Sequence, residues 1–163
     1  MPFTGTMIFE DEPERECWHE AGHAVVANHL GMTVIAIGFS WVRGEHQEPN
    51  PSCWIPTDGI DKESVAVHNL AGVAAEIVKL QDYNIMSCNS DVKACRELGC
   101  TLSHEHYIKQ AIEILKERDD ALVRVYHKLM EERVNPSREP FIDTVDKMKK
   151  QVHLTREEFE SLL

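Results

Sequence analysis

One stretch of the chain, His19-Glu20-Ala21-Gly22-His23, has residue types and spacing suited to metal-assisted hydrolysis. On an α-helix, positions i and i+4 lie on the same face, so both imidazoles can reach one ion. Glu20 lies about 100° around the helix from His19, where it can contact a water on the metal without being a ligand. The pattern therefore predicts a zinc site with Glu20 as general base.

A catalytic zinc site needs a third protein ligand, and the residues leave two candidates open. Such sites usually have three protein ligands and one open coordination position. Glu76 and Asp91 both lie on segments with helical patterns, and spacing alone does not choose between them. A structural interpretation also exists, in which His19 and His23 are packed helix residues and Glu20 is their salt-bridge partner. In that case Asp91 is an ordinary acidic residue at a helix N-terminus.

The helix that carries this stretch is expected to run to about Leu30. Pro13 suits the first helical turn, with Asp11 as the N-cap, and Gly31 is a good residue just past a helix C-terminus. Gly22 inside the helix costs about 1 kcal/mol relative to Ala. We therefore expect another segment to pack very close to Gly22.

A short β ribbon is expected after this helix. Residues 32–42 are rich in Val, Ile, Phe and Trp and lie between two glycines, which predicts a strand. Residues 44–52 contain two prolines and predict a loop, and residues 53–55 predict a short second strand. Because two strands alone are only marginally stable, this ribbon should pack on the helices.

Apolar residues at helical spacing and N-cap residues predict that the rest of the chain is helical. The expected helices cover residues 61–80, 89–99, 103–135, 137–150 and 155–162, with N-caps at Asp61, Asn89 or Ser90, Ser103 and Thr155. The expected fold is therefore mainly α. It is a single helical-bundle domain over residues 11–163 with a small β ribbon beside the helix of His19 and His23. Residues 1–10 are expected to form a partly ordered arm.

Composition narrows the class of partner. The 163 residues carry a net charge of −11, which argues against nucleic acid or an anionic membrane as a main partner. The first residues show no signal-peptide pattern, and the five cysteines include no C-x-x-C pair, so we expect a cytoplasmic, reduced protein. The other histidines are scattered and are expected to be surface or capping residues; they are His29, His46, His68, His127 and His153.

Three blocks of sequence together resemble the peptidase domain of FtsH-type AAA+ zinc metalloproteases. The first is residues 19–26 (HEAGHAVV), the second residues 70–76 (LAGVAAE) and the third residues 90–94 (SDVKA). They occur in the same order as in that family, and the resemblance extends over most of residues 10–160. The sequence departs from the family in having no G-x-x-x-x-G-K-[ST] loop, so we expect a peptidase domain without the nucleotide-binding ATPase module.

The resemblance implies a role for each site residue. Asp91 would be the third zinc ligand beside His19 and His23, Glu20 would be the base, and Glu76 would be a supporting residue or, failing Asp91, the alternative ligand. The implied activity is that of a zinc metalloendopeptidase with one catalytic Zn²⁺, which hydrolyses unfolded or extended protein by Glu-assisted attack of zinc-bound water.

The strand after the first helix and the resemblance also lead to expectations about substrate and partners. We expect substrate to bind the exposed edge of the first strand, at Val34, Ile35, Ala36, Ile37, Gly38 and Phe39. A homo-oligomer or a separate ATPase partner is compatible with the resemblance. The alternative function is a non-catalytic zinc-bearing module, for binding or regulation, that keeps the peptidase fold.

Overall fold

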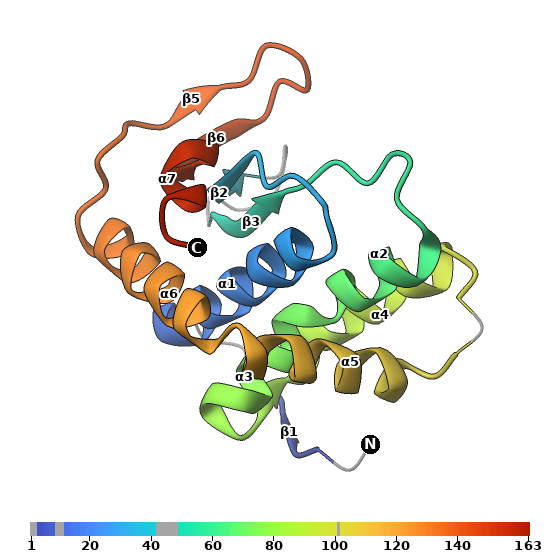
Figure 1. The fold of residues 1–163 in the computed structure, drawn as a ribbon. Helices are drawn as coiled ribbons and strands as arrows, with labels where there is room; N and C mark the ends of the chain where they lie inside the picture. Colours follow the sequence, from blue (N-terminus) through green and yellow to red (C-terminus); the bar gives the residue numbers. More distant parts are fainter. Residues whose placement is uncertain (1–2, 9–11, 42–48, 101) are drawn as a thin grey trace.

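Helices make up most of the described chain, which in this computed structural model comprises residues 3–8, 12–41, 49–100 and 102–163. The helices are α1 (Pro13–His29), α2 (Lys62–Asn69), α3 (Ala71–Leu80), α4 (Ile85–Glu97), α5 (His104–Glu117), α6 (Asp119–Val134) and α7 (Arg156–Glu160). The strands are β1 (Gly5–Thr6), β2 (Ala36–Trp41), β3 (Asn50–Trp54), β4 (Tyr83–Asn84), β5 (Phe141–Ile142) and β6 (Lys149–Thr155). The expectation of a mainly α protein with a small β element is confirmed (Figure 1).

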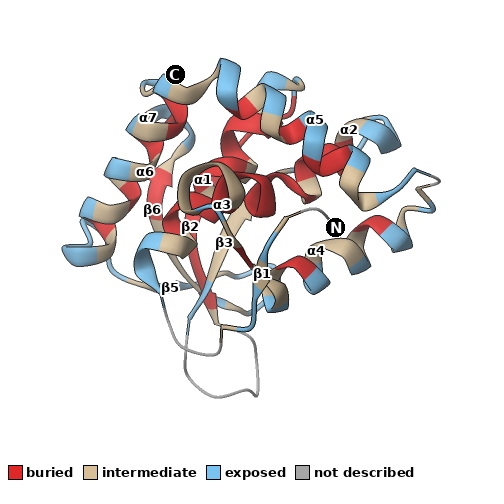
Figure 2. Ribbon diagram, turned by 90° about the horizontal axis from the view of Figure 1, so that it is seen from below, coloured by how far each residue is buried: buried red, intermediate tan, exposed pale blue. Residues whose placement is uncertain are grey.

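Helix α1 lies at the centre of the fold, between the sheet and the other helices (Figure 1). Val25, Val26 and Ala27 have no exposed surface, and the buried residues gather on α1 and α3 (Figure 2). A helix covered on nearly every side shows no single apolar stripe. The expected close approach at Gly22 is confirmed, because a Cβ there would lie 2.6 Å from the carbonyl oxygen of Ala71 on α3.

The ends of α1 follow the sequence signals in part. Gly31 has a φ of +84°, the left-handed conformation that glycine adopts readily past a helix end. The expected N-cap Asp11 lies outside the described residues, and Glu12 at the N-cap position makes no side-chain capping bond. None of the described helices is both long enough and apolar enough to cross a membrane.

The β element is larger than a two-stranded ribbon. Strands β3, β2, β6 and β5 form one sheet in that order, with every neighbouring pair antiparallel. The expected strand over residues 32–42 begins only at Ala36, and residues 50–52, expected in a loop, belong to β3. The expected helix over residues 137–150 is wrong, because this segment supplies β5 and the start of β6. Pairing of β5 with β6, and of β6 with β2 far away in sequence, outweighs the local helical pattern.

Three of the expected N-caps are present. The side chains of Asp61, Ser103 and Thr155 accept hydrogen bonds from the first turns of α2, α5 and α7, and Thr155 forms a capping box with Glu158. The cap expected at Asn89 or Ser90 is wrong, because α4 begins earlier and Asn84 accepts the capping bond from the Met86 N–H.

Two expected long helices are each divided into two. Residues 61–80 form α2 and α3, which meet at Leu70, and residues 103–135 form α5 and α6, which meet at Arg118. The backbone leaves helical geometry at these two residues without any Gly or Pro to mark the break. The break at Leu70 matters for the site, since it sets the direction of α3 against α1.

Candidate metal centre

The structure brings His19, His23 and Asp91 together at one point. The Nε2 atoms of the two histidines lie 3.0 Å apart. An Oδ2 atom of Asp91 lies 3.4 Å from Nε2 of His19 and 3.9 Å from Nε2 of His23. In the part of the chain that the structure describes, these three residues form the one group whose ligand atoms lie close enough together to hold a metal ion.

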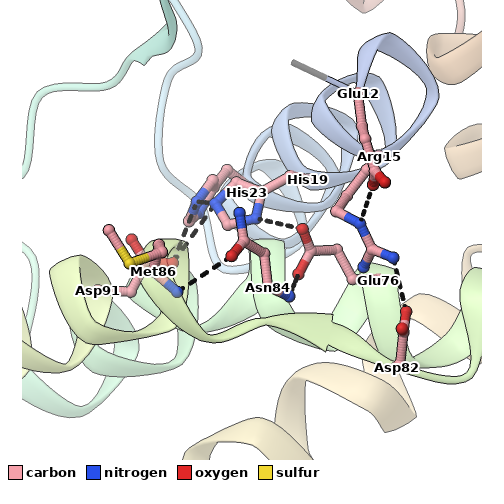
Figure 3. A network of polar contacts seen from close by, with 9 residues as sticks. All are labelled: Glu12, Arg15, His19, His23, Glu76, Asp82, Asn84, Met86 and Asp91. Atoms are coloured by element: carbon pink, nitrogen blue, oxygen red, sulfur yellow. Dashed lines mark hydrogen bonds and ion pairs between the residues drawn. The ribbon is translucent and has the colours of Figure 1, made fainter. Parts of the chain in front are cut away.

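Two helices supply the three side chains. His19 and His23 are one turn apart on α1, as their spacing predicts, and Asp91 is in the second turn of α4. Because α4 begins at Ile85 and not near Ser90, Asp91 is not at the helix N-terminus and points toward α1 (Figure 3). The interpretation of Asp91 as a residue that interacts with the helix dipole is therefore wrong.

A protein group lies beside the second ring nitrogen of each histidine. Nδ1 of His23 donates to the backbone carbonyl of His68 at 2.8 Å. Nδ1 of His19 makes no hydrogen bond to a described residue, but it lies 3.5 Å from Oε1 of Glu76. Partners of this kind fix the ring orientation of metal-binding histidines and leave Nε2 for the ion.

Glu76 lies on the far side of His19 from Asp91 (Figure 3). Its side chain is almost fully buried, and its Oε2 accepts the backbone N–H of Asn84 at 3.0 Å. Glu76 therefore contacts Nδ1 of His19, while Asp91 contacts Nε2. This geometry favours Asp91 over Glu76 as the third ligand and gives Glu76 the position of a supporting residue.

The donor atoms fit a zinc ion. Oδ2 of Asp91 is buried and has no hydrogen-bond partner within the described residues. It faces two imidazole Nε2 atoms, and leaving a buried carboxylate oxygen without a partner is costly. Two imidazole nitrogens and one carboxylate oxygen are ligands that Zn²⁺ accepts, with a fourth position left open.

The site shifts the pKa values of His19 and Glu20. Burial lowers the pKa of the His19 imidazole, but Asp91 and Glu76 outweigh it, so the pKa lies well above its ordinary value. Burial raises the pKa of Glu20, and the two imidazoles partly oppose this. A carboxylate with a raised pKa is a stronger base, as a general base requires.

A cleft of about 700 Å³ opens over these residues. Glu20 and His68 line it together with His19, His23 and Asp91, and β3 also forms part of its wall. Within the described chain, β3 pairs with β2 only, so its other edge has no strand partner.

The strand expected to bind substrate does not lie at this cleft. β2 is paired with β3 on one side and with β6 on the other, so it has no exposed edge. Of the six residues expected there, all but Ile35 are buried, and none lines the cleft. The expectation of an exposed edge at Val34, Ile35, Ala36, Ile37, Gly38 and Phe39 is wrong because β6 covers the side that a two-stranded ribbon would have left open.

Gly72 on α3 makes room for His19. A Cβ at Gly72 would lie 2.4 Å from Nε2 and 2.5 Å from both Cδ2 and Cε1 of the His19 ring, so a side chain there would displace the ring. Gly72 belongs to the second sequence block, residues 70–76. The sequence does not show why this position is a glycine, because the reason lies in the packing of α3 on α1.

The expectation that His68 is a surface or capping residue is wrong. His68 is 8% exposed and its ring lies beside that of His23. Burial and the neighbouring His23 lower its pKa to about 3, so the ring is neutral. His153 is also buried, against the same expectation, while His46 lies outside the described residues.

No protein-family model matches this chain, and no curated protein matches its sequence. The resemblance to FtsH-type peptidases therefore stays an expectation that rests on three short sequence blocks. A function for the protein has to come from the chemistry of the site. The site has the imidazoles of His19 and His23 close to the carboxylate of Asp91, and Glu20 lines the same open cleft.

Proposed function

We propose that the protein is a zinc-dependent metalloendopeptidase related to the proteolytic domain of FtsH. The observation that carries this proposal is the convergence of Nε2 of His19, Nε2 of His23 and Oδ2 of Asp91, all within 4.8 Å of one another. The hydrogen bond of His23 Nδ1 and the Glu76 carboxylate beside His19 Nδ1 support it, because they would leave both Nε2 atoms for the ion.

The residues around the ion have separate tasks in this proposal. A bound zinc would act as a Lewis acid toward a peptide carbonyl and would lower the pKa of water. Glu20 lines the cleft beside the three ligands and would accept the proton from the attacking water and return it to the leaving amine. Glu76 would hold the His19 ring in place and would not contact substrate, since its side chain is 1% exposed.

Substrate would bind as an extended chain along the free edge of β3. Asn50, Ser52, Cys53 and Trp54 line the cleft together with Pro51, and unpaired main-chain groups at a strand edge can bind an added strand. Pro51 has no N–H, so the edge offers fewer donors than acceptors. A binding mode that depends on main-chain groups suits unfolded protein, whose side chains vary. A separate ATPase or self-assembly would then deliver such substrate.

Two measurements on the same samples test the proposal. Native mass spectrometry gives the number of zinc ions per chain, and a casein digest gives cleavage by the wild type and by Glu20→Gln. The matched control is Glu14→Gln, the same chemical change at an exposed position of α1 outside the cleft. We expect one zinc in all three proteins, and cleavage by the wild type and the control alone. Loss of a general base typically lowers the rate by about 10²–10⁴-fold.

The possible results separate the two functions. Stoichiometric zinc without any cleavage that depends on Glu20 would contradict the peptidase and support the non-catalytic zinc module. A folded protein that takes up no zinc would contradict both.

A further inference from the structure

His23 and His68 exchange hydrogen bonds in a reciprocal pair. Nδ1 of His23 donates to the carbonyl of His68 at 2.8 Å, and Nδ1 of His68 lies 3.2 Å from the carbonyl of His23. A backbone carbonyl can only accept. Each ring therefore carries its proton on Nδ1, and these two bonds connect α1 to the last turn of α2.

This pairing fixes what the other nitrogen of His68 can do. In a neutral imidazole with the proton on Nδ1, Nε2 has a lone pair and is an acceptor. The same arrangement prepares Nε2 of His23 for the metal. In His68 it prepares an acceptor that the metal cluster does not include, since the group of converging ligand atoms contains His19, His23 and Asp91 without His68.

The ring of His68 lines the cleft. The residue is 8% exposed and lies there together with the metal-binding side chains. Its Nδ1 is taken up by the carbonyl of His23, and none of the hydrogen bonds between described residues involves Nε2. Nε2 is therefore the polar ring atom that is left to bind a molecule in the cleft.

We propose that His68 is a substrate-binding residue whose Nε2 accepts a hydrogen bond from one main-chain N–H of a peptide in the cleft. The proposal rests on the proposed function, because it takes the ligand of the cleft to be an extended peptide. The choice of a main-chain donor follows from the presence of β3 in the wall of the cleft. There β3 offers its edge, so the peptide backbone would run between β3 and the metal cluster and its N–H groups would be within the cleft.

The variant His68→Asn tests the role of Nε2 separately from that of Nδ1. The amide N–H₂ of Asn can take the place of Nδ1 and donate to the carbonyl of His23, but Asn has no atom at the position of Nε2. The carbonyl of residue 68 that accepts from His23 is backbone and is kept. His68→Asn should therefore keep the fold and bind zinc as tightly as the wild type.

The experiment measures peptide binding and does not depend on turnover. Tryptic peptides of casein are captured on zinc-loaded Glu20→Gln protein, and one captured peptide is labelled with fluorescein for anisotropy titration. Adding His68→Asn should weaken its binding about 3- to 10-fold, the effect of losing one neutral hydrogen bond. Zinc affinity is measured alongside by competition with a chromophoric chelator.

An N-methyl scan of the same peptide identifies the hydrogen bond. N-methylation removes one N–H at a time, and contacts with β3 make several positions sensitive. At one position the loss should be about 3- to 10-fold in Glu20→Gln and absent when His68→Asn is also present, because the same bond cannot be lost twice. A general disturbance of the cleft would weaken binding equally at every position.

Each result either supports or overturns the inference. Unchanged peptide affinity in His68→Asn overturns it, as does a scan in which no position loses its effect. A tenfold or greater loss of zinc affinity also overturns it, because the change in peptide binding would then come from a disturbed metal centre and not from the lost Nε2. If peptides bind with the predicted coupling but wild-type protein cleaves nothing, the peptidase fails and the role of His68 in binding stands. If no peptide binds, both fail.

Discussion

Replacing Gly72 by Ala should remove metal binding and leave the fold in place. A Cβ at Gly72 would lie 2.5 Å from Cδ2 and from Cε1 of the His19 ring. Carbon atoms in van der Waals contact lie about 3.5–4.0 Å apart, so the ring has to move by about 1 Å or more. The ring is the end of a rotatable side chain and can move without displacing α1 or α3.

The size of the effect follows from zinc geometry. Zinc–nitrogen distances are about 2.0–2.1 Å, with a tolerance of about 0.2 Å. A ring displaced by about 1 Å is no longer a ligand. Disturbing only an outer partner lowers metal affinity about 10–100-fold, so the loss of His19 should lower zinc affinity by at least about 100-fold. Exchanging Gly for Ala inside a helix favours the helix by about 1 kcal/mol, which offsets the repacking in the zinc-free protein.

The assay is a zinc titration against a chromophoric chelator, with urea unfolding of the zinc-free protein. Gly22→Ala is the matched control, since its Cβ would lie 2.6 Å from the carbonyl oxygen of Ala71 and 2.6 Å from Cβ of Ala75. Relief there requires α1 and α3 to separate, so this variant should lose about 1–3 kcal/mol of stability. If Gly72→Ala protein bound zinc within about threefold of the wild type, the His19 ring would not need the space at Gly72.

Other predictions concern the ligands, pH and one helix cap. Asp91→Ala should lower zinc affinity by at least about 100-fold and Glu76→Gln by about 10–100-fold, measured by the same titration; the reverse order would assign the third ligand to Glu76. Zinc affinity should rise about tenfold per pH unit between about pH 5 and 7, because His19, whose pKa is raised, must release its proton; a flat profile in calorimetric titrations would contradict this. The pKa of His68 is lowered from 6.5 to about 3, so between these values the unfolded chain binds the extra proton and acid reduces stability. His68 should contribute about 1.4 kcal/mol per pH unit to the fall in the free energy of unfolding. Urea unfolding of zinc-free protein should therefore show a shallower dependence on acid pH in His68→Asn than in the wild type. Equal slopes would argue against a neutral, buried His68. Thr155→Ala removes the capping box of α7 and should lower the free energy of unfolding by about 1 kcal/mol, seen as a lower melting temperature; an unchanged melt would mean that α7 does not take part in the cooperative unit.

Local signals in the sequence were enough for some elements of the fold. The caps at Asp61, Ser103 and Thr155 are made within one turn, so residue type and spacing predict them. The breaks at Leu70 and Arg118 have no Gly or Pro and arise from packing between helices. The segment 137–150 could not be told from an amphipathic helix without the pairing of β5 with β6 and of β6 with the distant β2.

In the site, too, local spacing predicts some features and others depend on distant packing. The positions of His19, Glu20 and His23 on one helix follow from helical spacing. The choice between Asp91 and Glu76 required the start of α4, which is set by a cap at Asn84 that the sequence pattern did not reveal. His68 and Gly72 could not be found from sequence, because their roles come from the packing of α2 and α3 on α1.

If His19, His23 and Asp91 hold one zinc ion, anomalous diffraction at the zinc absorption edge should locate it in crystals of zinc-loaded protein. We predict one anomalous peak about 2.0–2.2 Å from Nε2 of His19, Nε2 of His23 and a carboxylate oxygen of Asp91. A peak bound by Glu76 or His68 in place of Asp91, or no peak near the two histidines, would contradict it.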